Sequence, residues 1–165
     1  MTLPNITGMK AVKEQFLKRV MPEFNSWGLS QHPNPASPFG PIDYGYHYDF
    51  ADTTDRSDVK LVSFAIIQPN ASLWIAGHKA GKMVGDDRDL IILNGNTKET
   101  YRLARKWSIR RPLKARFELE SRGSKDPRIQ AEKLIDDVVD SLYKLKNISM
   151  ADDANSNPCA RLTVP

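Results

Sequence analysis

One segment, Val59–Gln68, constrains the fold of this chain more than any other. Its apolar residues occupy both alternating faces, with Leu61 and Ile67 on one side and Val62 and Ile66 on the other. A strand that is apolar on both faces requires cover on both sides, and such strands lie in the middle of sheets. We therefore expect a β-sheet with this segment as its central strand.

Other segments have the pattern of strands. Four of them show short apolar or alternating runs: Ile42–Phe50, Ser72–Ala76, Leu90–Leu93 and Leu113–Ser121. Between them, the glycine-rich stretch 77–89 and the proline-rich stretch 28–42 predict irregular connections. The stretch 96–107 has two readings, because Asn94-Gly95 favours a hairpin turn whereas Asn96 with Glu99 resembles the capping box of a helix.

Helices are predicted near both ends of the chain. Residues 8–21 carry apolar side chains at spacings of three and four, and Pro22 is expected to end that helix. Near the other end, Asp126 followed by Pro127 has the chemistry of an N-cap and a first helical residue. The apolar stripe that follows predicts a helix ending near Lys146.

A run of strands flanked by helices predicts an α+β fold. We expect a mainly antiparallel sheet of roughly five strands, with the N-terminal and C-terminal helices packed on one face. A chain of 165 residues suits a single core, which we place in residues 1–148. Residues 149–165 are polar and are predicted to form a disordered tail.

Composition narrows the class of protein. With 40% hydrophobic and 27% charged residues, the chain has globular composition. Its apolar runs are too short to span a bilayer, and the N-terminal stretch shows no secretory signal. The single cysteine, Cys159, cannot form an internal disulfide. These features predict a cytoplasmic protein that has no membrane partner.

Positive charge collects in one segment. Residues 102–128, here named the basic segment, contain ten Lys/Arg against three Asp/Glu, although the whole chain has a net charge of only +4. Guanidinium and ammonium groups could follow a phosphate backbone, with a tryptophan available for base stacking. The predicted nucleic-acid-binding residues are Arg102, Arg105, Lys106, Trp107, Arg110, Arg111, Lys114 and Arg116. In the alternative, Glu118 and Glu120 neutralise part of this charge through cross-strand pairs and leave an ordinary solvated surface.

Three other patterns favour a structural role. The stripe Tyr44, Tyr46, Tyr48 and Phe50 could stack bases, but such a row is more typical of a core face. The stretch Gly77–Lys82 fails the spacing of a phosphate-binding loop and lacks its hydroxyl residue, so we interpret it as a hairpin connection. The acidic run Asp86, Asp87 and Asp89 lacks calcium-loop spacing and is interpreted as a solvated turn.

No pattern specifies catalysis. Asp43 with Asp58 and Lys60 matches a metal-dependent nuclease only loosely. The three histidines have no metal-ligand spacing, no nucleophile–histidine set is evident, and the sequence implies no metal and no cofactor.

The leading hypothesis is therefore a small non-enzymatic binding protein whose basic segment engages an acidic partner, most plainly nucleic acid. A second hypothesis is a protein–protein interaction module, of inhibitor, immunity or chaperone type, that binds an acidic protein. A metal-dependent nuclease or hydrolase is the third hypothesis. The sequence leaves the oligomeric state open.

Overall fold

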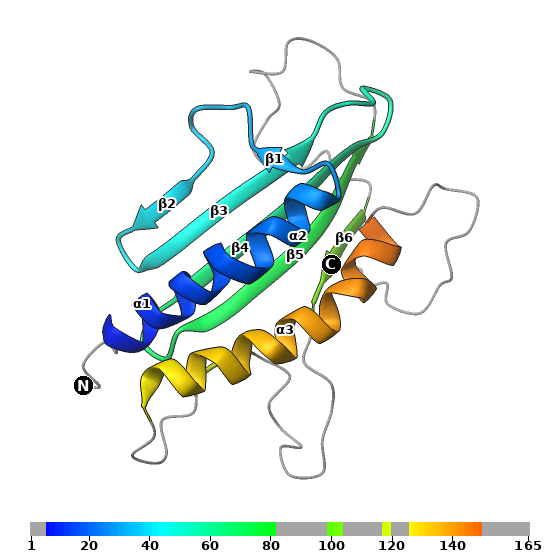
Figure 1. Cartoon of the computed structure of the whole chain (residues 1–165). Coiled ribbons are helices and arrows are strands. Elements are labelled where there is room, and N and C mark those ends of the chain that lie inside the picture. The colour runs from blue at the N-terminus through cyan, green and yellow to red at the C-terminus, as the bar shows by residue number, and fades with distance from the viewer. Residues whose placement is uncertain (1–5, 82–98, 104–116, 120–125, 150–165) are drawn as a thin grey trace.

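The computed structural model describes residues 6–81, 99–103, 117–119 and 126–149. Two helical segments lie side by side over one face of a twisted sheet, as Figure 1 shows. The elements in chain order are α1 (Ile6–Gln15), the π-helical turn η1 (Phe16–Val20), α2 (Met21–Ser26), β1 (Ser30–Gln31), β2 (Phe39–Ile42), β3 (Gly45–Asp52), β4 (Val59–Ile67), β5 (Ser72–Gly81), β6 (Glu99–Arg102) and α3 (Pro127–Ser149).

All strand pairs in the sheet are antiparallel. The strand order is β1–β3–β4–β5–β6, and β2 also pairs with β3. Strand β4 lies in the middle, which confirms the prediction from its two apolar faces. The α+β class with terminal helices on one face is also confirmed, with six strands in the sheet.

The strand predicted over Ile42–Phe50 is in fact parts of two strands. Residue Ile42 ends β2 and pairs with Gly45, which begins β3, so the chain reverses between them. A side chain at Gly45 would collide with the backbone carbonyl of Ile66 on β4, so the close approach of these strands requires glycine. Tyr44 falls in the turn and is 55% exposed, outside the aromatic row to which the alternation assigned it.

The proline-rich stretch also contains strand residues that were not predicted. Strands β1 and β2 pair with the same edge of β3, at Phe50–Ala51 and at Gly45–Tyr48 respectively. Residues 30–31 and 39–42 thus form two parts of one edge strand, and residues 32–38 between them do not belong to the sheet. We name residues 32–38 the edge loop.

Strand β5 is longer than the sequence predicted. The sequence placed its end at Ala76 and a flexible connection from residue 77, but pairing with β4 continues to Gly81. The outer side of β5 pairs with β6, so residues 99–102 of the ambiguous stretch are strand and not helix. Part of the expected strand Leu113–Ser121 is described, and there Phe117 and Leu119 are buried and join the sheet beside Leu73 and Asn70. The expected strand Leu90–Leu93 lies outside the described residues.

The N-terminal helix passes through Pro22, which was expected to end it. In η1 the Met21 amide donates to the carbonyl of Phe16, five residues back in place of four. The hydrogen-bonding pattern of the helix therefore shifts by one residue just before the proline. Pro22 therefore occupies the first turn of α2, where a missing N–H costs nothing. The helix continues to Ser26.

Helix α3 begins as the sequence predicts. The Asp126 carboxylate accepts a hydrogen bond of 2.9 Å from the Arg128 amide, and Pro127 is the first helical residue. The helix continues to Ser149, slightly beyond the predicted end near Lys146.

Of the described helices, none has both the length and the apolar content needed to span a bilayer. The predicted tail from residue 150 onward, including Cys159, lies outside the described residues.

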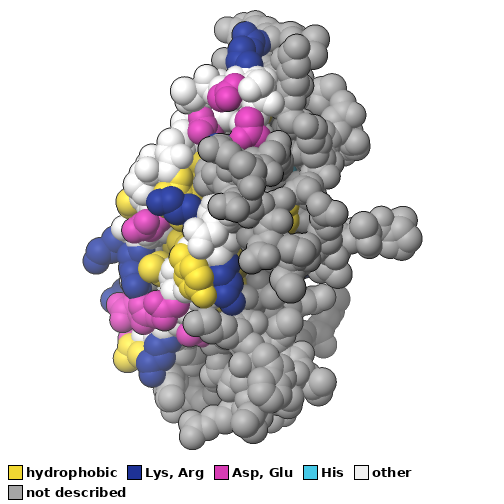
Figure 2. Space-filling view, turned by 90° about the vertical axis from the view of Figure 1, so that its right-hand side faces the viewer, with side chains coloured by type: hydrophobic (Ala, Val, Ile, Leu, Met, Phe, Trp, Pro, Cys, Tyr) yellow, Lys and Arg dark blue, Asp and Glu magenta, His cyan; other side chains and the backbone are white. Residues whose placement is uncertain are grey.

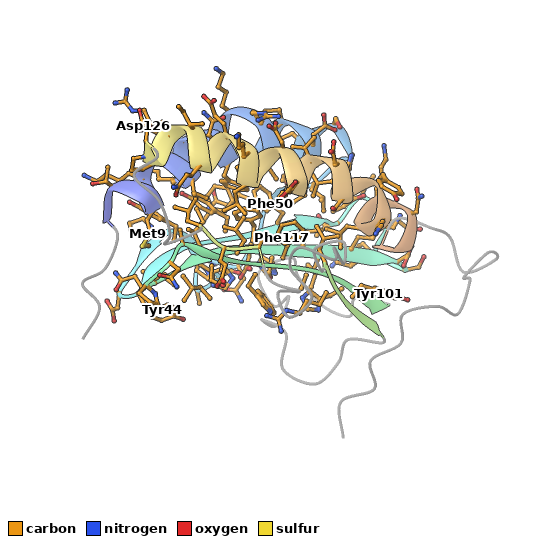
Figure 3. All side chains as sticks on the ribbon, turned by 90° about the horizontal axis from the view of Figure 1, so that it is seen from below. Met9, Tyr44, Phe50, Tyr101, Phe117 and Asp126 are labelled. Atoms are coloured by element: carbon orange, nitrogen blue, oxygen red, sulfur yellow. The ribbon has the colours of Figure 1, made fainter. Side chains whose placement is uncertain are left out.

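The hydrophobic core fills the space between the helices and one sheet face. Figure 3 shows Met9, Phe50 and Phe117 in this layer. At its centre the Phe16 ring stacks on Phe64 with 4.1 Å between ring centroids, and both side chains are fully buried. Tyr48 and Phe50 pack against the same Phe16 ring, which confirms the core role predicted for these two members of the aromatic row.

Candidate functional site

The strands present a second set of side chains on the face opposite the helices, which we name the far face. In the strand register Asp49 lies opposite Ser63, Ser63 opposite Ala76, and Ala76 opposite Arg102. Because partners in antiparallel strands share a face, this row crosses the sheet from β3 to β6. It is bordered by His47, Trp74 and His78.

A buried carboxylate is the centre of the far face. Asp49 is 5% exposed and accepts hydrogen bonds from the hydroxyls of Ser63 (2.6 Å) and Ser37 (2.7 Å). The Nε2 atom of His47 lies 2.9 Å from the same carboxylate. These contacts join β3 to β4 and to the edge loop. They satisfy a charged group whose burial would otherwise be costly.

The environment of Asp49 keeps it ionised. Burial alone would raise the pKa of its carboxyl, but hydrogen bonds from His47, Ser63 and Ser37 outweigh burial and hold the pKa below its usual value. The Asp49 carboxylate is therefore negative at neutral pH.

Two buried histidines lie within the electrostatic reach of this carboxylate. His78 on β5 is 4% exposed, and burial lowers its pKa to about 4 although the negative charge of Asp49 opposes the shift. His32, at the start of the edge loop, is 6% exposed, and burial lowers its pKa against the same opposing charge. Both imidazoles are neutral at pH 7.

This cluster joins β3, β4 and the edge loop, because both serine hydroxyls donate their hydrogens to Asp49. The lowered pKa of Asp49 makes its carboxylate a weak proton acceptor for these hydroxyls. The cluster was not predicted from the sequence, in which the three histidines show no metal-ligand spacing. Alternation along β3 already places His47 and Asp49 on one face, but Ser37 and Ser63 join them only through strand pairing at long range.

Of the predicted nucleic-acid-binding residues, the structure describes Arg102. Its exposed guanidinium lies on β6, 6.0 Å from the centre of the half-buried Trp74 ring. Such an arrangement is a cation–π contact. The other seven predicted residues lie outside the described part of the chain: Arg105, Lys106, Trp107, Arg110, Arg111, Lys114 and Arg116. The same holds for Glu120, so the alternative of cross-strand neutralisation also stays a prediction.

The helical layer carries side chains of both signs of charge. Helix α3 has four basic and four acidic side chains. The Arg19 guanidinium donates to the Asp136 carboxylate at 2.6 Å, across the two helical segments. On the described part of the side seen in Figure 2, basic and acidic side chains are interspersed. Helix α3 therefore has no net charge, whereas the N-terminal helical segment has four basic and two acidic side chains.

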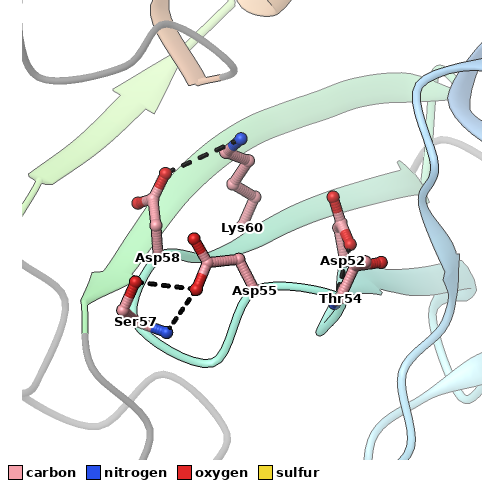
Figure 4. Close-up of polar contacts among 6 residues, drawn as sticks. All are labelled: Asp52, Thr54, Asp55, Ser57, Asp58 and Lys60. Carbon is pink, nitrogen blue, oxygen red and sulfur yellow. Dashed lines mark hydrogen bonds and ion pairs between the residues drawn. The ribbon is translucent and has the colours of Figure 1, made fainter.

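The structure brings two of the three residues of the nuclease hypothesis together and separates the third from them. Asp58 lies 3.6 Å from Lys60, in the turn between β3 and β4 that Figure 4 shows. Asp43 lies in the turn at the other end of β3, because Asp52 pairs with Lys60 and Gly45 with Ile67. The length of the strand separates the two aspartates by roughly 20 Å. They do not share a metal site in this fold.

The remaining motifs carry no ligand geometry among the residues described. Residues Gly77–Gly81, interpreted from the sequence as a hairpin connection, belong to β5, so that interpretation is wrong. Lys82 and the acidic run Asp86, Asp87 and Asp89 lie outside the described residues. Within the described ranges, no three histidine, cysteine, aspartate or glutamate side chains are grouped to hold a metal ion.

Comparisons with protein-family models, with curated proteins and with solved structures found no match for this chain.

Proposed function

We propose that this is a small binding protein whose basic segment, residues 102–128, contacts nucleic acid. The observation that carries the proposal is the uneven charge: this segment has ten basic against three acidic residues, whereas helix α3 has four of each. An excess of this kind attracts polyanions and is screened by salt.

Arg102 supports the proposal from the described part of the segment. Its guanidinium is exposed at the edge strand β6 and lies over Trp74 on the far face. A planar cation beside an aromatic ring suits a nucleotide, because the cation meets phosphate and the ring meets a base. Trp107, within the segment, offers a second ring of the same kind.

Fluorescence anisotropy with labelled oligonucleotides tests this proposal. Single- and double-stranded DNA and RNA of equal length would be titrated with the protein at about 50 mM salt, where phosphate contacts are strongest. The test variant is Arg110→Glu/Arg111→Glu. The matched control is Lys18→Glu/Lys133→Glu, which makes the same change in net charge at two exposed lysines of the helical layer.

The proposal predicts that the test variant weakens binding by about tenfold or more, while the control weakens it much less. Equal losses in both variants would show that only total charge matters and would overturn the assignment to the basic segment. Absence of binding to every oligonucleotide would overturn the nucleic-acid proposal. The acidic-protein hypothesis would then be pursued by affinity capture with the same pair of variants.

A further inference from the structure

The edge loop is closed at both ends by one residue. The amide of His32 donates to the Asp49 carbonyl, and the amide of Asp49 donates to the carbonyl of Pro38, each at 3.0 Å. The Ser37 hydroxyl adds a third bond to the Asp49 carboxylate, at 2.7 Å. The loop therefore leaves the sheet and returns to it at a single position of β3.

The side chain of His32 holds the loop in shape from inside. Its Nδ1 atom accepts a hydrogen bond of 3.1 Å from the Asn34 amide, so this nitrogen carries no proton in the closed loop. Asn34 in turn accepts bonds from the amides of Ala36 (2.9 Å) and Ser37 (3.0 Å). The position of Ser37 against Asp49 thus depends on a chain of bonds that begins at a neutral imidazole.

Among the described residues, Asp49 on β3 is the charged group that acts electrostatically on His32. Asp49 in turn contacts His47 on the same strand and acts electrostatically on His78 of β5. Strand β4 contributes the neutral hydroxyl of Ser63, and the helices cover the opposite face. Asp49 is the one negative group of this set, and it already accepts the three contacts described above.

We propose that the edge loop is an acid-released flap and that His32 is its trigger. A proton taken from solvent by Nδ1 converts this acceptor into a donor that faces the Asn34 amide, and the bond between them is lost. The resulting imidazolium is buried, so the loop moves outward to hydrate it. Opening frees the backbone N–H and C=O of Asp49 at the sheet edge, while the helix-side core stays folded.

The direction of the pH effect follows from burial. Burial lowers the pKa of His32 from its ordinary 6.5, and the charge of Asp49 opposes that shift. A group whose pKa is lowered in the closed state stabilises closure fully above pH 6.5, and that stabilisation is lost as the pH falls toward the lowered pKa. The core beneath the helices, formed by residues such as Phe16, Phe64 and Ile75, supplies an internal reference, because burial raises the pKa of its Tyr48 hydroxyl above the usual 10 and keeps it neutral at these pH values.

Amide hydrogen exchange resolved by NMR between pH 7.5 and 5 tests the proposal. We expect the protection factors of Asn34, Ala36 and Ser37 to fall by up to about tenfold per pH unit, while those of Phe64 and its neighbours on β4 stay constant. The key variant is His32→Asn, whose side-chain oxygen replaces Nδ1 as acceptor but does not titrate in this range. In this variant the edge-loop amides should stay protected at pH 7.5 and should not lose that protection at pH 5.

Three results would overturn the proposal. The edge loop and β4 could lose protection together, which would indicate global unfolding. Acid opening could persist in His32→Asn, or it could disappear in His47→Asn, which would transfer the trigger to the other histidine beside Asp49. If His32→Asn does not fold, the NMR titration of the His32 imidazole in the natural chain replaces it. The pH midpoint of that titration must coincide with the pH midpoint at which the Ser37 amide loses its exchange protection, and a mismatch would overturn the proposal.

Discussion

The two faces of the sheet are built from alternating residues of the same strands, yet they are stabilised in different ways. On β4, Phe64 points under the helices and stacks on Phe16, whereas its neighbour Ser63 points to the far face and donates to Asp49. Both side chains are almost completely buried, with exposures of 0% and 2%. Burial therefore does not distinguish the faces; the kind of interaction does.

This difference determines how each face responds to change. Apolar packing is non-directional, so the helix-covered face depends on volume and area and is insensitive to pH. Hydrogen bonds to a buried carboxylate require correct geometry and correct protonation, so the far face depends on strand register and on pH. The far face is where the fold can respond to its surroundings.

The largest effect is expected from the helix-covered face. Phe64→Ala removes a fully buried ring at the centre of the core and should lower the free energy of unfolding by about 3–5 kcal/mol. Urea denaturation monitored by circular dichroism measures this change. Leu17→Ala, at a 37% exposed position of the same layer, is the control and should cost less than about 1 kcal/mol.

A smaller loss is expected when the far-face carboxylate is removed. Asp49→Ala leaves the hydroxyls of Ser37 and Ser63 without their acceptor and should lower the free energy of unfolding by about 2–3 kcal/mol. A double-mutant cycle with Ser63→Ala in urea should show that the two changes are not additive. Additive effects would mean that the two residues do not act as a unit.

Acidification should lower the free energy of unfolding through the far face, by less than the substitutions above. Burial lowers the pKa of His78 to about 4 and that of His32 below 6.5. As the pH falls below 6.5, these histidines therefore take up protons in the unfolded chain before they do so in the folded chain. The free energy of unfolding should decrease by up to about 1.4 kcal/mol per pH unit for each histidine until its folded pKa is reached. Urea midpoints measured at intervals from pH 7.5 to 4.5 give the slope. A flat profile would contradict the buried neutral state of these imidazoles.

The smallest effect is expected at a helix end, away from both faces. Asp126→Ala removes the cap of the Arg128 amide and should cost about 1 kcal/mol in urea. Asp126→Asn keeps an acceptor oxygen and should recover most of that loss. If the two variants are equally destabilised, the charge at the helix start matters more than the hydrogen bond.

Local chemistry in the sequence predicted several elements correctly. The two apolar faces of Val59–Gln68 identified the central strand, and Asp126 with Pro127 identified the start of α3, because both signals depend on neighbouring residues alone. The expected stop at Pro22 was wrong because the π-turn before it changes the hydrogen-bonding partner, and this turn has no sequence signature that we recognise.

Features that depend on long-range pairing escaped prediction. Strand β5 continues through Gly77 and His78 because β4 and β6 hold it on both sides, although its composition favours a loop. The Asp49 cluster draws on residues from three separate stretches of chain, and only strand register brings them together. Of the predicted nucleic-acid-binding residues, Arg102 is the one within the described part, so that interpretation awaits binding measurements.

The salt dependence of oligonucleotide affinity tests the central functional claim most directly. We predict that the logarithm of the association constant falls linearly with the logarithm of salt concentration, with a slope that reflects several phosphate contacts. Arg110→Glu/Arg111→Glu should make this slope shallower by about 1.4–1.8, the amount expected for two lost contacts, while Lys18→Glu/Lys133→Glu should leave the slope unchanged. A slope near zero, or the same slope in all three proteins, would contradict the account.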